Sequence, residues 1–393
     1  MVMEFLGYRR EDGQVGIRNK ILIISVDECC DGIARKIGDA SENTVILTNW
    51  YTCMLGGNEE TFNQMVAVGK SPNVAGVLVL AMGCGSIPPE SIVNPIEATG
   101  KKVKYLVCQK EGGTRKTIEK GKEIVKEMDN YIKNLVPEKF PLSKLIVGVK
   151  CGGSDTSSGI ASNPSVGKMV DTLVEMGGTC IGGELFELIG CEKILTKRAV
   201  NDKVKEKILT LIDNEKKRWS VEGTDLETMS IGNSVGGLTT IEEKSLGALH
   251  KMGHKPIEDV LQINKDFIDR PTKPGFYLSE VTMLCGGAGV NYAALGAHII
   301  VWTSGAAGFN NPIVPVIRVS GNSELINDDI DVNVSGIMSG EIGVDEGGKL
   351  IVEKIAKVAN GEKTNLEDIG SSTLTLYQKD QRVENLVGLK CVR

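Results

Sequence analysis

Three cysteines in the first third of the sequence occupy positions that suit a metal site. Cys29, Cys53 and Cys84 each come after an apolar stretch with the pattern of a buried strand, so we expect them at strand ends. Thiolates that converge from separate strands can hold a soft metal or three corners of an iron–sulfur cluster, whose open iron position acts as a Lewis acid. Free cysteine is also a common core residue, and the sequence contains no Cys-x-x-Cys pair that would decide between the two interpretations.

A glycine-rich loop after another predicted strand is a candidate anion site. The loop consists of Cys151, Gly152, Gly153, Ser154 and Asp155. Backbone amides in such a loop can form a nest at a helix N-terminus that suits a carboxylate or a sulfonate. The side chains of Ser154, Asp155 and Ser158 would add contacts. An ordinary strand-to-helix turn with capping side chains explains the same residues.

Lys244 is the candidate for proton transfer. It follows Glu242 and Glu243, and a desolvated lysine beside carboxylates can exchange a proton with a substrate carbon. A helix start with both acids in its first turn explains the glutamates without catalysis, so only the lysine keeps a catalytic role. Glu184 and Glu187 are spaced by three and share one helical face if their loop begins a helix.

Two further polar pairs are candidates for substrate binding. Arg18 and Asn19 come directly before the first predicted strand, where an arginine can either clamp a carboxylate or brace a domain interface. Asp331 and Asn333 alternate along an extended segment and are candidate pocket residues. The sequence leaves both alternatives for Arg18 open.

The elements that must position these residues alternate between strand and helix. Apolar runs typical of buried strands cover residues 20–26, 44–48, 74–81 and 102–108, and helical stretches separate them. This alternation predicts a parallel sheet covered on both faces, with ligands beyond the carboxyl ends of its strands. We therefore predict an α/β protein, with a doubly wound parallel-sheet domain at residues 1–137 and a larger α/β domain at residues 138–393.

Composition excludes several classes of function. The 393 residues carry a net charge of −6 with basic and acidic residues interspersed, which argues against a nucleic-acid partner. Aromatic residues make up 4%, too few to stack bases or sugar rings. The apolar runs are too short to span a bilayer, so we expect no membrane partner. The N-terminus is charged where a signal peptide is apolar, so we expect a cytoplasmic protein whose ten cysteines are reduced.

Five segments of the sequence together resemble one protein family. They are GYRREDGQVGIRN at 7–19, CGGSD at 151–155, SGIASNP at 158–164, GGLTTIEEKSLG at 236–247 and IDVN at 330–333. The combination is similar to the altronate/galactarate dehydratases and to the related sulfolactate sulfo-lyases, from about residue 5 to about residue 360. The resemblance implies a metal-dependent lyase that eliminates water or sulfite from a small 2-hydroxy acid to give a 2-keto acid. Aldonates, aldarates and sulfolactate are the implied substrates.

The resemblance also implies a set of metal ligands. The family pattern has cysteines at the positions of Cys29, Cys53 and Cys84, and Cys285 stands where the family has a carboxylate. Two further positions depart from the pattern, because Asn49 and Tyr51 replace histidines and Gly287 replaces a glutamate. The expected cofactor is a mononuclear metal, Fe²⁺ or Mn²⁺, or a [4Fe–4S] cluster with Cys29, Cys53 and Cys84 at three of its corners.

Roles for the remaining candidates follow from the same resemblance. Glu184 and Glu187 lie in the family's carboxylate-bearing loop, which implies ligand or base roles, and Lys244 lies in a matching segment. The loop from Cys151 to Ser158 is implied to bind the acid groups of the substrate.

Members of the family often carry a small N-terminal domain, which we expect this protein to be without. In the sulfo-lyase branch the small domain is a separate subunit. We therefore expect a small partner subunit or a member that works without one, and a homo-oligomer. Two alternatives remain: an iron–sulfur lyase that acts on a different small acid, and a non-catalytic large subunit that its partner completes.

Overall fold

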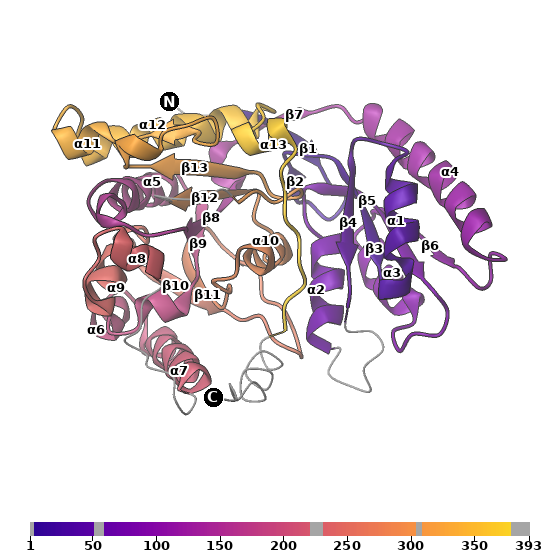
Figure 1. Cartoon of the computed structure of the whole chain (residues 1–393), viewed down its shortest axis with the longest axis horizontal. Helices are drawn as coiled ribbons and strands as arrows, with labels where there is room; N and C mark the ends of the chain where they lie inside the picture. The colour runs from indigo at the N-terminus through magenta and orange to yellow at the C-terminus, as the bar shows by residue number, and fades with distance from the viewer. Residues whose placement is uncertain (1–3, 51–58, 221–230, 304–308, 379–393) are drawn as a thin grey trace.

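A four-stranded parallel sheet forms the first part of the protein (Figure 1). The computed structural model describes residues 4–50, 59–220, 231–303 and 309–378. The strand order is β4-β3-β5-β6, with β3 Lys20–Ser25, β4 Thr44–Thr48, β5 Val74–Ala81 and β6 Lys102–Val107. The covering helices are α1 Asp31–Gly38, α2 Glu59–Gly69, α3 Pro89–Glu97 and α4 Thr114–Lys133. All eight residues of β5 are buried, as an apolar strand inside a parallel sheet requires.

A seven-stranded parallel sheet forms the second part, and its order is β10-β11-β9-β8-β12-β13-β14. The strands are β8 Ile146–Cys151, β9 Thr179–Gly182, β10 Ile257–Leu261, β11 Gly275–Ser279, β12 Ile299–Thr303, β13 Val316–Ser320 and β14 Val332–Asn333. The larger helices are α5 Asn163–Glu175, α7 Asp202–Trp219, α9 Ile241–His250, α10 Cys285–Ala294 and α12 Val344–Ala359. Shorter helices are α6 Glu192–Lys197, α8 Ile231–Val235, α11 Gly336–Ser339 and α13 Asn365–Ile369. The predicted α/β class is confirmed.

The two parts share one interior. A single hydrophobic cluster contains Ile24 of β3 and Tyr277 of β11, and α2 packs against α10. A three-stranded antiparallel sheet adds a second link, because β1 Glu4–Arg9 pairs with both β2 Val15–Gly16 and β7 Glu138–Pro141. None of the helices in the described ranges has the length and apolar character that a bilayer span requires.

Each large sheet has a point where its winding reverses, and this is where parallel sheets bind ligands. In the first sheet β3 leads to β4 on one side and β5 leads to β6 on the other. Asp27 follows β3 and accepts a hydrogen bond of 2.6 Å from the backbone of Met82 after β5. In the second sheet the reversal lies between β8 and β12, and the Gly152 amide after β8 donates to the Thr303 carbonyl at 2.6 Å.

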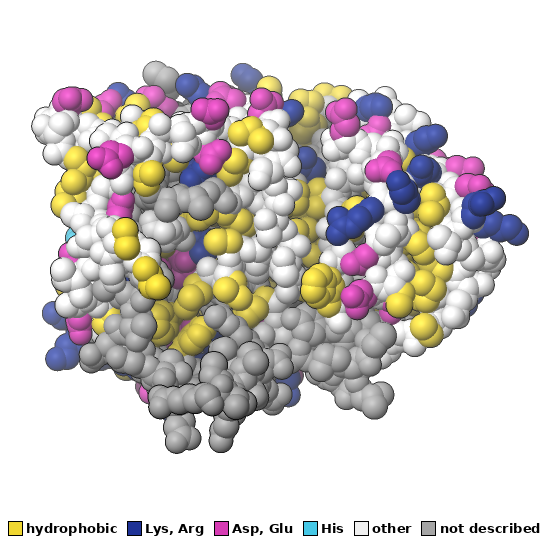
Figure 2. All heavy atoms as spheres, in the orientation of Figure 1, with side chains coloured by type: hydrophobic (Ala, Val, Ile, Leu, Met, Phe, Trp, Pro, Cys, Tyr) yellow, Lys and Arg dark blue, Asp and Glu magenta, His cyan; other side chains and the backbone are white. Residues whose placement is uncertain are grey.

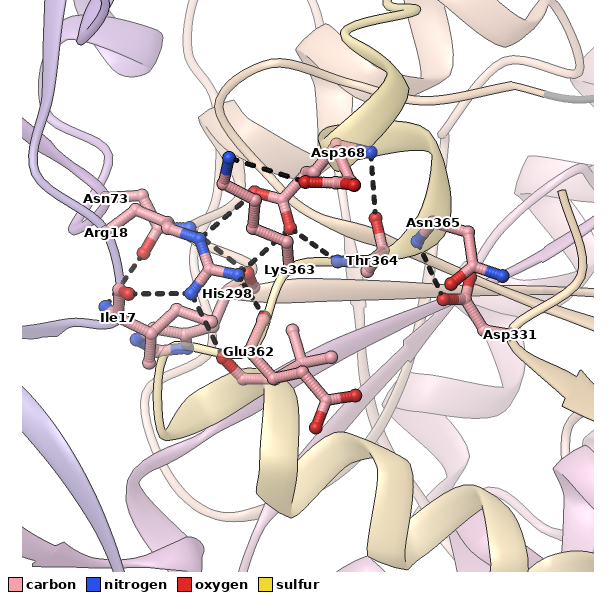
Figure 3. A network of polar contacts seen from close by, with 12 residues as sticks. Ile17, Arg18, Asn73, His298, Asp331, Glu362, Lys363, Thr364, Asn365 and Asp368 are labelled. Carbon is pink, nitrogen blue, oxygen red and sulfur yellow. Dashed lines mark hydrogen bonds and ion pairs between the residues drawn. The ribbon is translucent and has the colours of Figure 1, made fainter. Parts of the chain in front are cut away.

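Arg18 ties the start of β3 to the C-terminal helices (Figure 3). Its guanidinium group donates to both carboxylate oxygens of Glu367, each at 3.0 Å. The same group also donates to the carbonyls of Ile17, Val358 and Glu362. All its donors are therefore engaged by the protein, and the structure favours the bracing interpretation over a substrate clamp.

Asn73 and His298 complete this junction. Asn73 accepts the Ile17 amide and donates to the carbonyls of His298 and Ile313, which joins the two large sheets. The buried imidazole of His298 accepts the Ile146 amide at Nδ1, and its Nε2 donates to the Val15 carbonyl at 2.6 Å. Burial lowers the pKa of His298 to about 4, so the imidazole is neutral in the folded protein.

We predict that Arg18→Met lowers the free energy of unfolding by about 3 kcal/mol, because it leaves the largely buried carboxylate of Glu367 without its counter-charge. Urea denaturation followed by circular dichroism measures the change. Arg9→Met is the matched control, since the ion pair between Arg9 and Glu138 is exposed to solvent and should contribute much less to stability than the buried pair. Equal losses in the two variants would contradict the bracing role.

We predict that His298 makes stability fall as the pH drops from about 6.5 to 4. Unfolded histidine has a pKa near 6.5, so within this window the unfolded state binds the extra proton and is favoured, by up to about 3 kcal/mol. His298→Gln, which keeps an acceptor and a donor, should remove this part of the pH dependence of the urea midpoint. The exposed His254→Gln should keep it. An unchanged slope in His298→Gln would be inconsistent with a neutral buried imidazole.

Candidate active site

Five charged side chains gather beyond the carboxyl ends of β8 and β9. Lys150 is the penultimate residue of β8, Glu184 follows β9, and Glu187 lies in the short helix Leu185–Leu188. Lys244 comes from α9 and Lys251 from the turn directly after it. Ion pairs of 2.5 to 3.4 Å connect the group into one network. Four of the five residues are buried, and the side chain of Lys244 is 13% exposed.

Glu184 is the centre of the network. Its Oε1 lies 2.5 Å from Lys150 Nζ, its Oε2 accepts the Cys151 amide at 2.6 Å, and the same oxygen lies 3.4 Å from Lys251 Nζ. Glu184 has a φ of 62°, and it is the one non-glycine residue with a positive φ in the described part of the chain. A left-handed conformation is unfavourable for a side chain with a Cβ and persists where the surroundings hold it, most often at functional sites.

Glu187 connects the buried side of the network to its accessible side. Its Oε2 lies 3.0 Å from Lys251 Nζ, and its Oε1 lies 3.4 Å from Lys244 Nζ. Burial alone would raise the pKa of Glu187, but the ammonium groups of Lys251, Lys244 and Lys150 outweigh burial and lower the pKa to about 2. Glu187 is therefore a carboxylate at neutral pH.

Lys150 and Lys251 remain charged although they are completely buried. Burial lowers the pKa of each lysine, but the negative groups around them reverse this effect and raise both pKa values above 10.5. Glu184 acts most strongly on Lys150, followed by Cys285 and Glu187. Within the network three lysine side chains thus face two glutamate side chains.

A pocket of about 230 Å³ opens onto the Lys244 side of the network. The loop after β8, the π-helical turn Ser158–Ser162 and α9 form its walls. Its lining includes Ser154, Asp155, Ser158, Lys244 and His250. The predicted proton-transfer lysine and three of the predicted anion-binding residues therefore line the same pocket.

Gly236 allows the segment before α9 to pack closely on the loop after β8. A Cβ at this position would lie 2.8 Å from the Cβ of Asp155. A side chain here would therefore collide with the loop that lines the pocket.

Side-chain hydrogen bonds hold the conformation of the loop after β8. Asp155 Oδ1 accepts from the hydroxyls of Ser157 and Ser158, and Asp155 Oδ2 accepts from Asn322. Asp155 Oδ1 also accepts the Ser158 backbone amide at 2.8 Å, which is a capping contact of the kind that the alternative interpretation of the loop predicts. Ser154 differs, because its hydroxyl lies 3.0 Å from the thiol of Cys151 beside the charged network.

Lys150 and Lys251 are the site residues that the sequence interpretation missed. Lys150 had a recognisable signal, since it is a lysine inside the apolar strand IVGVKC. A charged residue in a strand buried on both faces needs a buried counter-charge, which points to a functional site. Lys251 gave no comparable signal, because it follows a helix end, where a lysine is ordinary.

The cysteines predicted as metal ligands do not form a metal-binding group in the described part of the chain. Cys29 lies in the 3-10 helix Glu28–Cys30 and Cys84 follows β5, whereas Cys285 begins α10 beside the seven-stranded sheet. All three are exposed. Cys53 lies outside the described residues. Among those residues no three His, Cys, Asp or Glu side chains are arranged to hold a metal ion. The metal and cluster assignments stay predictions, and we derive no chemistry from them.

The remaining substrate-binding candidates lie outside the pocket. Asn19 accepts a hydrogen bond from Arg10 near the Arg18 junction. Asp331 is engaged by the amides of Arg318 and Asn365, and Asn333 caps its own turn by accepting the Ser335 amide. The side-chain oxygens of these residues serve the junction and the sheet edge, so we interpret them as structural.

Comparison with known proteins identifies the family. The model for the second domain of D-galactarate dehydratase/altronate hydrolase matches residues 7–133. The model for the C-terminal domain of D-galactarate/altronate dehydratase matches residues 142–382. These two ranges contain the four-stranded sheet and the seven-stranded sheet, respectively.

Three named relatives cover almost the whole chain. The (2R)-sulfolactate sulfo-lyase subunit beta of Chromohalobacter salexigens is 34% identical over 95% of this chain and 96% of that protein. Altronate dehydratase of Bacillus subtilis is 31% identical over 95% of this chain and 77% of that protein. Galactarate dehydratase (L-threo-forming) of Escherichia coli is 29% identical over 93% and 74%. Their names describe carbon–oxygen and carbon–sulfur lyases, so the resemblance seen in the sequence is confirmed: the protein belongs to the D-galactarate/altronate dehydratase family.

Proposed function

We propose that this protein is a lyase that eliminates water or sulfite from a small 2-hydroxy acid and releases a 2-keto acid. The observation that carries the proposal is the charged network beside the pocket. In this network Lys244 pairs with Glu187, and the fully buried Lys150, Glu184 and Lys251 lie behind this pair. Such an elimination needs a base for the α-proton, an acid for the leaving group and positive charge for the substrate's acid group. The network contains a group of each kind.

The substrate's carboxylate is expected to enter the pocket toward Lys244 and the backbone of the loop after β8. Its negative charge draws the ammonium group of Lys244 away from Glu187, and a second negative charge beside Glu187 raises the pKa of that carboxylate. Substrate binding thus converts Glu187 from a very weak base into one able to accept a proton. The buried Lys251, 3.0 Å from Glu187, holds the carboxylate in position.

In the elimination itself, the ion pair of Lys244 and Glu187 supplies both the proton donor and the proton acceptor. Glu187 accepts the proton from the α-carbon, the bond between the β-carbon and its oxygen breaks, and the leaving hydroxyl takes a proton from Lys244 to become water. The remaining enol tautomerises to the 2-keto acid. Glu187 is then protonated and Lys244 is neutral, and the 3.4 Å between them lets the proton return and restore the ion pair.

The names of the relatives support the substrate class. They act on altronate, galactarate and (2R)-sulfolactate, which are all small 2-hydroxy acids. The sulfolactate enzyme matches over nearly its full length and is called subunit beta, which supports a separate small partner subunit for this protein too.

We predict that a panel of aldonates, aldarates and (2R)-sulfolactate contains a substrate. The purified protein, assayed alone and with the small subunit of the sulfolactate enzyme, should form a 2-keto acid that a semicarbazide or lactate-dehydrogenase assay detects. Release of sulfite, measured with a chromogenic disulfide reagent, distinguishes cleavage of a carbon–sulfur bond from cleavage of a carbon–oxygen bond. No 2-keto acid from any acid in either setting would reject the proposal.

We predict that Lys244→Met and Glu187→Gln each lower kcat by at least about 100-fold, because each removes one half of the proton-transfer pair. Glu242→Gln is the matched control: it lies in the same first turn of α9, but its side chain is exposed. Circular dichroism checks that all three variants are folded. Normal turnover in either pair variant would show that the chemistry takes place elsewhere.

A further inference from the structure

Two buried thiols form a contact that the proposed reaction does not use. Cys30 ends the 3-10 helix after β3, and Cys108 directly follows β6. Their sulfur atoms lie 3.7 Å apart, and the side chains are 0% and 2% exposed. Among the described residues this is the one pair of cysteines whose thiols are hydrogen-bonded to each other.

The two side chains are close enough for disulfide chemistry. Their sulfur atoms are in hydrogen-bond contact, and either thiol can be the donor. Two thiols in direct contact are the arrangement from which a disulfide forms once one of them is oxidised.

We propose that Cys30 and Cys108 are a redox-modification site, which a peroxide oxidises to an intramolecular disulfide in the folded protein. One of the two thiols attacks the peroxide, and its sulfur becomes a sulfenic acid as the oxygen–oxygen bond breaks and one water leaves. The other thiol then attacks that sulfur, and a second water leaves. Two thiols and one peroxide thus give one disulfide and two waters. The distance between the two sulfur atoms must decrease from 3.7 Å to about 2.05 Å when the bond forms.

The bond would fix the carboxyl edge of the four-stranded sheet. It joins residues 78 positions apart and links the segment after β3 to the turn after β6. Asp27, three residues before Cys30, already connects this segment to β5 through the Met82 amide. A disulfide here would therefore connect three of the four strand ends and lower the entropy of the unfolded chain.

The test is peroxide treatment of the intact protein, followed by alkylation, proteolysis and mass spectrometry. We expect a Cys30–Cys108 cross-linked peptide that dithiothreitol removes, while Cys180 of β9, which is equally buried, stays reduced. The oxidised protein should also have a higher urea midpoint. The proposal is overturned if both cysteines remain thiols while the exposed Cys29, Cys84 and Cys285 are oxidised, or if Cys30 pairs with one of those three.

Two alanine variants separate the disulfide from other effects of oxidation. Cys108→Ala should abolish the peroxide-dependent rise in the urea midpoint, whereas Cys180→Ala should keep it. A rise that persists in Cys108→Ala would show that another modification is responsible. The peptide mapping uses the wild-type protein, so it decides the question even if either variant fails to fold.

Discussion

Pairing of buried charge is the constraint on which the site depends. Lys150 and Lys251 are completely buried, and an unpaired ammonium group in such a place costs several kcal/mol. Glu184 pairs with both, and it does so from a left-handed backbone conformation that the rest of the loop must hold. Because every member of the network is held by another, Lys244 is positioned at the pocket lining and Glu187 is positioned directly behind it.

The two parallel sheets place polar residues at their winding reversals for the same topological reason. Loops on opposite sides of a reversal diverge and leave space beyond the strand ends. In the seven-stranded sheet this space adjoins the loop after β8, with Ser154 and the charged network. In the four-stranded sheet it adjoins Asp27 and the thiol-bearing loops. A shared hydrophobic cluster and the Arg18 junction hold the two sheets together. In Figure 2 basic and acidic side chains are interspersed over the visible face, which agrees with a small-molecule substrate.

The cysteines illustrate how one residue type serves different purposes within a short distance along the chain. Cys29 and Cys30 are neighbours, yet one is exposed and the other is packed against a second thiol in the core. The side chains of adjacent residues in a helical turn point in different directions, so sequence proximity says little about shared function. The sequence indicated a metal-ligand role for Cys29, whereas the contact between the sulfur atoms of Cys30 and Cys108 is visible only in the tertiary structure.

The sequence by itself determined the α/β class, because apolar strand patterns alternate with helices, and it determined the family through five collinear segments. It also indicated Glu184, Glu187 and Lys244, since carboxylates and a lysine near glycine pairs are unusual. Only the tertiary structure decided that these three meet, and that Lys150 and Lys251 join them. The charge pairing joins residues 34 to 67 positions apart, and no local sequence pattern reports such contacts. For the same reason only the tertiary structure shows that the Arg18 guanidinium donates to Glu367, which is 349 positions away in the sequence.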